Sequence, residues 1–264
     1  MEAELVLTLE DEDWDSIEEL IRCCNEADGT GYSTEPDGDF FYLVRNTEPE
    51  ESGMEAALLA VLFGYRLGET ENGQEVLELC AYTLPAARQL GCFTLCLHAL
   101  QDDFRGYCFR FLTKPRCISA EGVAPTDTAG SGANDISPEG QWGLPEDTRE
   151  TLQALGAEHL YDELFLMKTL PRGIADPGEG LCDTFGEVFF SRFNADTLYL
   201  YGLLVYERYQ RQGHGREMLE KLEAQPEGPY RHILLQVSSR NLPALSLYRS
   251  LAYQTREMLS YWKI

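Results

Sequence analysis

The segment VYERYQRQGHGR at residues 205–216 carries the strongest local pattern in this chain of 264 residues. It follows an apolar run at 197–205 that is typical of a strand and leads into a helical pattern at 215–223. Gly213 and Gly215 stand at alternate positions, so backbone N–H groups can approach an anion closely. A helix that begins at Gly215 directs its unpaired N–H groups and its positive dipole end to the same place. The segment predicts a phosphate-binding turn between a strand and a helix.

A second pattern, LQVSSRNLPALSLYRSLAY at residues 235–253, predicts a strand, a turn with Asn241 and a helix with Tyr248 near its end. Taken together, the two segments resemble the GNAT superfamily of acetyl-coenzyme A-dependent N-acetyltransferases. The motif V-x-P-x-x-[RQ]-x-x-G-x-[GA] corresponds to 205–215, and N-x-x-A-x-x-L-Y corresponds to 241–248. Glu207 replaces the usual proline and Ala252 replaces a glycine, and neither change removes a group that the chemistry needs.

The resemblance implies acetyl-coenzyme A as co-substrate and assigns residues to it. The backbone of Leu203, Leu204 and Val205 would pair with the pantetheine arm. The Asn241 side chain would hydrogen-bond the same part of the cofactor. The pyrophosphate would be held by N–H groups of the turn, at Gln210, Arg211, Gln212, Gly213, His214, Gly215 and Arg216.

Two proton-transfer roles are needed when an amine attacks a thioester. By the resemblance, Tyr248 would face the sulfur, where a phenol can donate a proton to the departing thiolate. Glu207 is the first candidate for the base, with Glu187, Tyr199 and Tyr201 as alternatives. The competing interpretations are an amphipathic core residue for Tyr248 and a solvated surface carboxylate for Glu207.

The order of elements at 197–222 recurs at 75–100 when Gly91 is placed over Gly213. Farther along the chain, the difference in residue number between equivalent positions of the two copies is smaller, by about the length of the segment 119–146. That segment is rich in Gly, Pro and Ser, so it is predicted to be a mobile insertion. The alternative is chance similarity between amphipathic segments.

The fold class is therefore predicted as α/β (α+β), with tandem GNAT-like domains that each hold a mixed, mostly antiparallel sheet flanked by helices. We place the domains at 1–170 and 178–264, with a linker at 171–177. Phe93 takes the second glycine position of the first copy, and Pro145 and Leu152 stand in place of Asn241 and Tyr248. The N-terminal domain is thus predicted to be degenerate and noncatalytic. It is expected to complete the substrate wall, with the acceptor between the domains.

Other patterns predict helices at 13–24, 92–100, 147–155 and 243–251. Strands are predicted at 40–45, 76–84, 106–113, 159–170, 186–193 and 232–237 and at the C-terminal end, with an apolar run at 56–67 in the opening sheet.

The formal charge of −24 disfavours nucleic acid and anionic membranes as partners, although acidity also serves solubility alone. The eight cysteines lack C-x-x-C pairs, which favours reduced thiols and no metal. No apolar stretch has the length of a membrane span, and the first residues are acidic instead of basic and then apolar, so a cytoplasmic location is expected. His98 and His159 are interpreted as structural.

The predicted activity is direct transfer of an acetyl group to a primary amine, small molecule or peptide, in a ternary complex. The alternative is a noncatalytic acyl-coenzyme A sensor or interaction module. Polyamine, aminoglycoside, amino acid and peptide N-terminus all stay open as acceptors, and the sequence indicates no oligomeric state.

Overall fold

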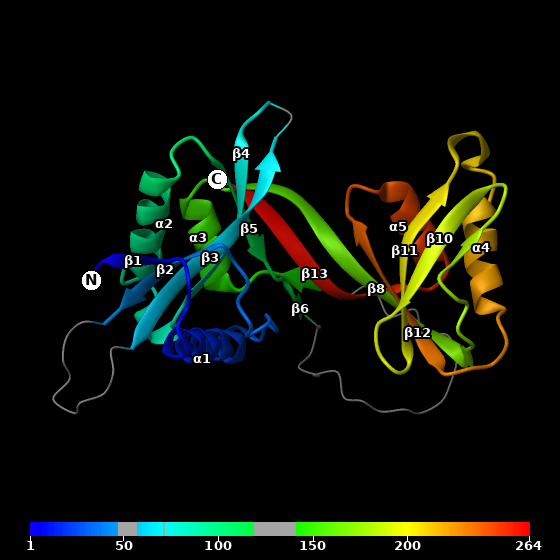
Figure 1. Cartoon of the computed structure of the whole chain (residues 1–264), viewed down its shortest axis with the longest axis horizontal. Helices are drawn as coiled ribbons and strands as arrows, with labels where there is room; N and C mark the ends of the chain where they lie inside the picture. The colour runs from blue at the N-terminus through cyan, green and yellow to red at the C-terminus, as the bar shows by residue number, and fades with distance from the viewer. Residues whose placement is uncertain (47–56, 71, 119–140) are drawn as a thin grey trace. The chain divides into compact units, whose positions relative to one another are not determined.

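The computed structural model describes residues 1–46, 57–70, 72–118 and 141–264 (Figure 1). These residues fall into two compact units. Unit 1 comprises Met1–Ile118, Trp142–Leu160 and Leu259–Ile264, and the described part of unit 2 is essentially Tyr161–Met258. The chain therefore returns to unit 1 at its C-terminal end.

The sheet of unit 1 contains β1 (Ala3–Val6), β2 (Phe40–Arg45), β3 (Leu58–Glu69), β4 (Glu75–Thr83) and β5 (Cys108–Thr113), adjacent in that order. Residues 260–263 of β13 (Gln254–Lys263) pair with β5 as a further strand. All these pairs are antiparallel except β4 with β5, which run parallel. A separate ribbon is formed by β6 (Arg116–Ile118) and β7 (Gln141–Gly143).

Helices cover both faces of this sheet. Helix α1 (Asp11–Asp28) packs on Phe41 and Leu43 of β2, whereas α2 (Cys92–Asp103) packs on the other face with Phe40 and Tyr42. Strand β2 is therefore apolar at successive positions, because both of its faces are buried. Helix α3 (Glu146–Ala154) begins after Pro145.

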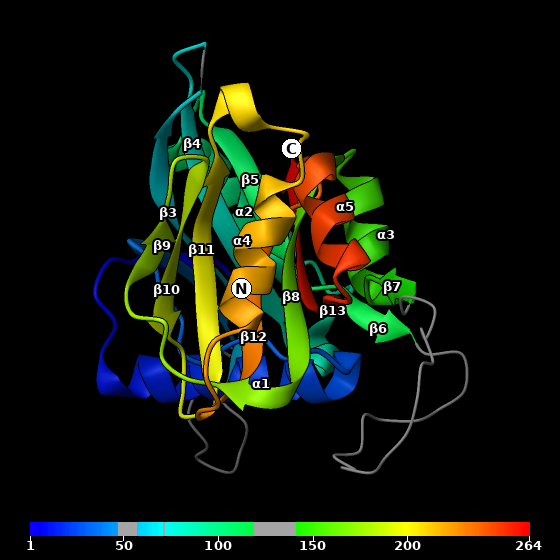
Figure 2. The ribbon, with the colours of Figure 1, turned by 90° about the vertical axis from the view of Figure 1, so that its right-hand side faces the viewer.

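The sheet of unit 2 has the order β8 (Glu158–Ile174), β12 (Tyr230–Ser238), β11 (Thr197–Val205), β10 (Gly186–Arg192) and β9 (Gly180–Cys182). Only β11 and β12 run parallel. Helices α4 (His214–Glu223) and α5 (Leu242–Ser250) pack on one face (Figure 2). In the described part of unit 2, no helix covers the opposite face.

Each unit is thus a mixed, mostly antiparallel sheet with helices, as predicted. Both contain one parallel strand pair, and in both the first strand of that pair leads through a turn into a helix: β4 into α2, and β11 into α4. Strands β2 and β11 have the predicted bounds, and the other expected helices and strands agree to within a few residues.

Several short strands and one long one differ from the sequence-based expectation. Residues 171–174, placed in a linker, are the end of β8, where Ile174 pairs with Tyr230. Gly173 is needed there because a Cβ would lie 2.2 Å from the Gly228 carbonyl oxygen. The pattern gave no sign of β1, β6, β7 or β9, which are only three or four residues long. Most of the expected insertion, 119–140, lies outside the described residues, and its remainder enters β7 and α3.

Candidate functional site

The centre of the unit 2 site is the point where β11 and β12 separate. The parallel ladder joins Thr197–Leu200 to His232–Leu235, and β11 then continues to Val205 with no further pairing to β12. Its other edge stays paired to β10 up to Val205. Apart from the Val205 carbonyl, which accepts from the Gln210 side chain, the β12-facing backbone groups of 201–205 are therefore open to a ligand. This stretch includes the predicted Leu203, Leu204 and Val205.

A bulge accompanies this separation. The register between β10 and β11 shifts between Glu187 and Phe189, and Gly202 of β11 has a φ of 63°. A glycine in the left-handed region with one extra residue on its strand is the arrangement of a glycine β-bulge, which bends the strand that carries it.

The turn after β11 has the conformation that exposes backbone N–H groups. It consists of a short 3-10 turn, η2 (Glu207–Tyr209), followed by left-handed residues Arg211 (φ 60°) and Gly213 (φ 94°). The Gln210 side-chain amide donates to the Val205 carbonyl, 3.1 Å away, and so fastens the turn to the strand end. Such alternation of backbone conformation forms an anion-binding concavity.

Helix α4 begins immediately after Gly213 with no side chain capping its first N–H groups. Gly215 lies against the next helix and the strand end, because a Cβ there would be 3.2 Å from Leu247 Cδ2 and 3.5 Å from Val205 Cγ2. A larger side chain would crowd this end of the site, which explains the second glycine of the motif.

The side chains around the turn are engaged with the protein. His214 stacks on Phe185 with ring centroids 3.9 Å apart, so its backbone N–H and not its ring is available to a ligand. Arg216 donates to Ser250 Oγ at 2.5 Å, which links α4 to α5. Arg211 and Gln212 are exposed.

Asn241 has a role that the sequence analysis did not anticipate. It is the N-cap of α5, where its Oδ1 accepts a hydrogen bond from the Ala244 N–H at 3.2 Å. Within the described residues its Nδ2 has no protein partner, and it is exposed. The amide can therefore cap the helix and still donate to a ligand.

Tyr248 lies on the buried face of α5, with 6% of its surface exposed, beside Tyr253 at 5.6 Å between ring centroids. Burial raises the pKa of Tyr248 to about 12. The phenol thus stays neutral at physiological pH and can donate a hydrogen bond. Because this pKa lies above that of a thiol, about 8.5, a phenol here can donate a hydrogen bond to a thiolate without losing its proton.

The candidate bases fall into two groups. The rings of Tyr201 and Tyr199 stack with centroids 6.2 Å apart, on the face of the unit 2 sheet that no helix of the described unit covers. Phe189 stacks on Tyr201, and Glu187 lies two residues before it in β10, so Glu187 is on the same face. Glu207 instead lies beyond the strand end, exposed in η2. Tyr248, on the helix-covered face, is therefore across the sheet from the first group.

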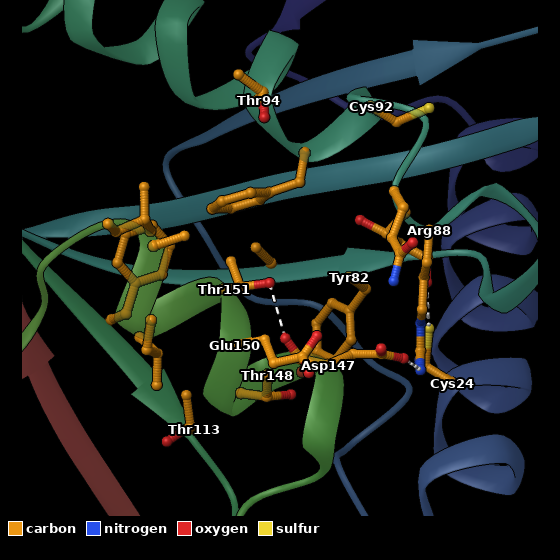
Figure 3. Close-up of a pocket in the computed structure, with 18 of the residues that line it drawn as sticks. Cys24, Tyr82, Arg88, Cys92, Thr94, Thr113, Asp147, Thr148, Glu150 and Thr151 are labelled. Carbon is orange, nitrogen blue, oxygen red and sulfur yellow. Dashed lines mark hydrogen bonds and ion pairs between the residues drawn. The ribbon is translucent and has the colours of Figure 1, made fainter.

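Unit 1 contains a cavity that the sequence analysis missed. Its volume is about 480 Å³, and it lies where β4 and β5 separate beyond Leu79 and Phe111 (Figure 3). Arg88, Asp28 and Asp147 line it together although they are far apart in the chain. Only the Arg88 turn carried a local pattern, so no sequence signal connected these three residues.

Among the described residues, no group of three or more His, Cys, Asp or Glu side chains is arranged to hold a metal ion. No helix within the described ranges is long and apolar enough to cross a membrane.

The unit 2 site coincides with a family match. Residues 183–253, which run from β10 through the turn to α5, match the Acetyltransferase (GNAT) family. No curated protein matches the chain. The predicted resemblance is confirmed over this segment, and it supports acyl transfer as the general chemistry.

Solved structures with a similar fold cover the whole chain. A GCN5-related N-acetyltransferase from Sphaerobacter thermophilus is 13% identical, with a TM-score of 0.52, over 99% of this chain and 95% of that one. A tandem GNAT protein from the clavulanic acid biosynthesis pathway is 10% identical, with a TM-score of 0.54, over 100% and 98%. A glucosamine N-acetyltransferase region of a fungal β-N-acetylglucosaminidase is 10% identical, with a TM-score of 0.59, over 99% and 38%. These likenesses confirm the predicted tandem GNAT fold.

Proposed function

We propose that this chain is an N-acetyltransferase that moves an acetyl group from acetyl-coenzyme A to a primary amine at the unit 2 site. The observation that carries the proposal is the open edge of β11, which ends in a turn with free N–H groups at the start of α4. A pantetheine amide needs such a strand edge, and a diphosphate needs such a helix start.

The residues present fit the parts of the cofactor. The open edge of β11 at Leu203, Leu204 and Val205 faces the pantetheine arm, and the turn at 211–216 offers N–H groups to the pyrophosphate. The N–H of Gln210, which the sequence analysis also assigned to the pyrophosphate, instead donates to the Glu207 carbonyl at 3.3 Å. Asn241 offers its free amide. Acetyl-coenzyme A supplies an activated carbonyl, whose bond to sulfur breaks as the bond to the amine nitrogen forms.

Tyr248 and a base serve the two proton-transfer roles. The neutral phenol of Tyr248 stabilises the departing thiolate by hydrogen bonding. Glu207 takes the amine proton, through water if the distance requires it, and Glu187 is the alternative because it lies opposite Leu204 of the open strand. Each of the eight cysteines is free of disulfides, which supports a cytoplasmic protein. A small-molecule or peptide amine is the proposed partner.

The test is release of free thiol from acetyl-coenzyme A in the presence of a panel of amines, alongside calorimetric titration with the thioester alone. Binding and amine-dependent release are expected together. Glu207→Gln is expected to lower kcat about tenfold or more and Glu187→Gln to leave it nearly unchanged, and the reverse result would exchange their roles. A lack of thioester binding would reject the site.

The exposed position of Glu207 favours a second candidate, a noncatalytic acyl-coenzyme A-binding module. Such a module would bind the thioester but release no thiol with any amine, and its binding would be unaffected by Tyr248→Phe.

A further inference from the structure

The cavity of unit 1 is built on the same strand separation as the unit 2 site but has different walls. Strand β4 contributes Tyr82 and Thr83, β5 contributes Phe111, and α3 contributes Thr151 (Figure 3). Its volume of about 480 Å³ lies within the range of small-molecule sites, roughly 300 to 1,000 Å³.

The charge in these walls is negative. Asp28, Asp147 and Glu150 line the cavity, and Arg88 is the one guanidinium among the lining residues. Arg88 is fully engaged: its Nη atoms lie 2.7 and 2.8 Å from the two Asp28 oxygens and 2.8 Å from Asp147. Because three carboxylates face one neutralised guanidinium, the cavity repels anions and attracts a cation.

A tyrosine hydroxyl that can bond a ligand lines the same space. Tyr82 lines the cavity with only 8% of its surface exposed, and its hydroxyl has no hydrogen-bond partner within the described residues. Its ring meets that of Tyr32 edge to face, 5.2 Å away. Within the described residues this hydroxyl is not one of the fully buried polar atoms that lack a partner, so it is open to the cavity and can bond a ligand there. The aromatic rings beside it favour a cation.

The walls also exclude a second copy of the cofactor site. Phe93 stands where unit 2 has Gly215, and it packs against Phe111 at 6.0 Å between centroids. A diphosphate would meet this ring and the carboxylates of α3.

We propose that the unit 1 cavity binds an organic ammonium ion, a protonated amine with an apolar or aromatic body, and that no acyl transfer takes place there. The ammonium group interacts with the carboxylates and the Tyr82 hydroxyl, and the body of the ligand packs on the aromatic side chains. This site is independent of the proposed unit 2 activity.

The experiment uses the full chain without any thioester and compares two probes by calorimetry at pH 7. The probes are 2-phenylethylamine, which is an ammonium ion, and 2-phenylethanol, which has the same body without the charge. We expect saturable binding of the amine and at least about tenfold weaker binding of the alcohol, since hydrogen bonds to charged groups are the stronger kind.

Two variants locate the site. Glu150→Gln removes a charge from an exposed residue with no described partner, so it should leave the fold intact and weaken amine binding severalfold. Tyr82→Phe is expected to weaken it about fivefold. Glu146→Gln is the matched control, because Glu146 lies on α3 but does not line the cavity, and it should have no effect.

Equal affinity for the two probes, no binding of the amine, or equal effects of Glu150→Gln and Glu146→Gln would each overturn the proposal. Loss of amine binding in Glu207→Gln alone would place the amine in unit 2 and overturn it as well. Thiol release by unit 2 is measured separately, so either proposal can fail without the other.

Discussion

The turns that follow β4 and β11 share one backbone conformation but present different chemistry. Each begins with a 3-10 turn, η1 (Pro85–Ala87) in unit 1 and η2 in unit 2. Left-handed residues follow at equivalent places, Gln89 (φ 62°) and Gly91 (φ 84°) against Arg211 (φ 60°) and Gly213 (φ 94°). The backbone of a repeated turn has thus been kept while its side chains changed.

The shared backbone is supported by equivalent hydrogen bonds. The Arg88 Nε donates to the Thr83 carbonyl at 3.4 Å, as the Gln210 amide donates to the Val205 carbonyl at 3.1 Å. Arg or Gln at this motif position therefore serves to fasten the turn to its strand. In unit 1 the same arginine also binds two carboxylates, which converts the turn into a wall of an acidic cavity.

The largest expected effect comes from making unit 2 resemble unit 1 at one position. Gly215→Phe places a ring where Leu247 and Val205 already lie within contact of a Cβ. We expect the thioester affinity measured by calorimetry to fall at least about a hundredfold, because the cost of overpacking and the loss of anion contacts both weaken binding. Phe93→Leu is the matched control in unit 1 and should leave thioester affinity unchanged. Similar losses in both variants would contradict the assignment of the cofactor to unit 2.

Tyr248→Phe gives unit 2 an apolar residue where unit 1 has Leu152. We expect kcat to fall about a hundredfold with little change in thioester affinity, because the phenol acts on the departing thiolate. Tyr253→Phe is the control. Its buried hydroxyl has no partner within the described residues, so its removal should not lower kcat and should leave stability equal or higher. Equal kcat in wild type and Tyr248→Phe would remove the residue from the mechanism.

The burial of Tyr248 also predicts a difference at high pH. Its pKa rises from 10.0 to about 12 on folding, so the stabilisation is fully present below about pH 10 and is lost as the pH rises through 12. Raising the pH from 9 to 12 should therefore lower the free energy of unfolding of Tyr248→Phe by about 2 kcal/mol less than that of wild type. Chemical unfolding at each pH measures this, and parallel curves for the two proteins would show that the hydroxyl is solvated.

The smallest expected effect concerns the helix caps. Asn241→Ala removes the cap of α5 and should lower the free energy of unfolding by about 1 kcal/mol. Pro145→Ala, at the equivalent place before α3, has no side-chain cap to lose and should cost less. Asn241→Ser keeps a side chain that can cap the helix. If acetyl-coenzyme A affinity falls in Asn241→Ala but not in Asn241→Ser, the main role of Asn241 is to cap α5, and a direct contact to the cofactor is not needed.

Local pattern predicted much of the fold and the conformation of the turn after β11. The run at 197–205, the glycines of the turn and the amphipathic helix after it are neighbours in sequence, and their conformations follow from neighbouring residues. The motif also gave the position of Tyr248 on α5, because the lengths of the helix and strand between motif residues fix their spacing in the sequence. The differences of the first copy, Phe93 and Leu152 in place of Gly215 and Tyr248, were visible for the same reason.

Residues that are distant in sequence were brought together only by tertiary packing. The amino-acid sequence alone determined the turns, the tandem repeat and the type of each longer element, since these depend on periodicity and on glycine conformation. The tertiary structure decided that Asp28, Arg88 and Asp147 share one cavity, that the end of β13 belongs to unit 1, and that 171–174 is strand. The reason is physical: burial and charge pairing depend on which elements pack together, and no pattern among neighbouring residues records that.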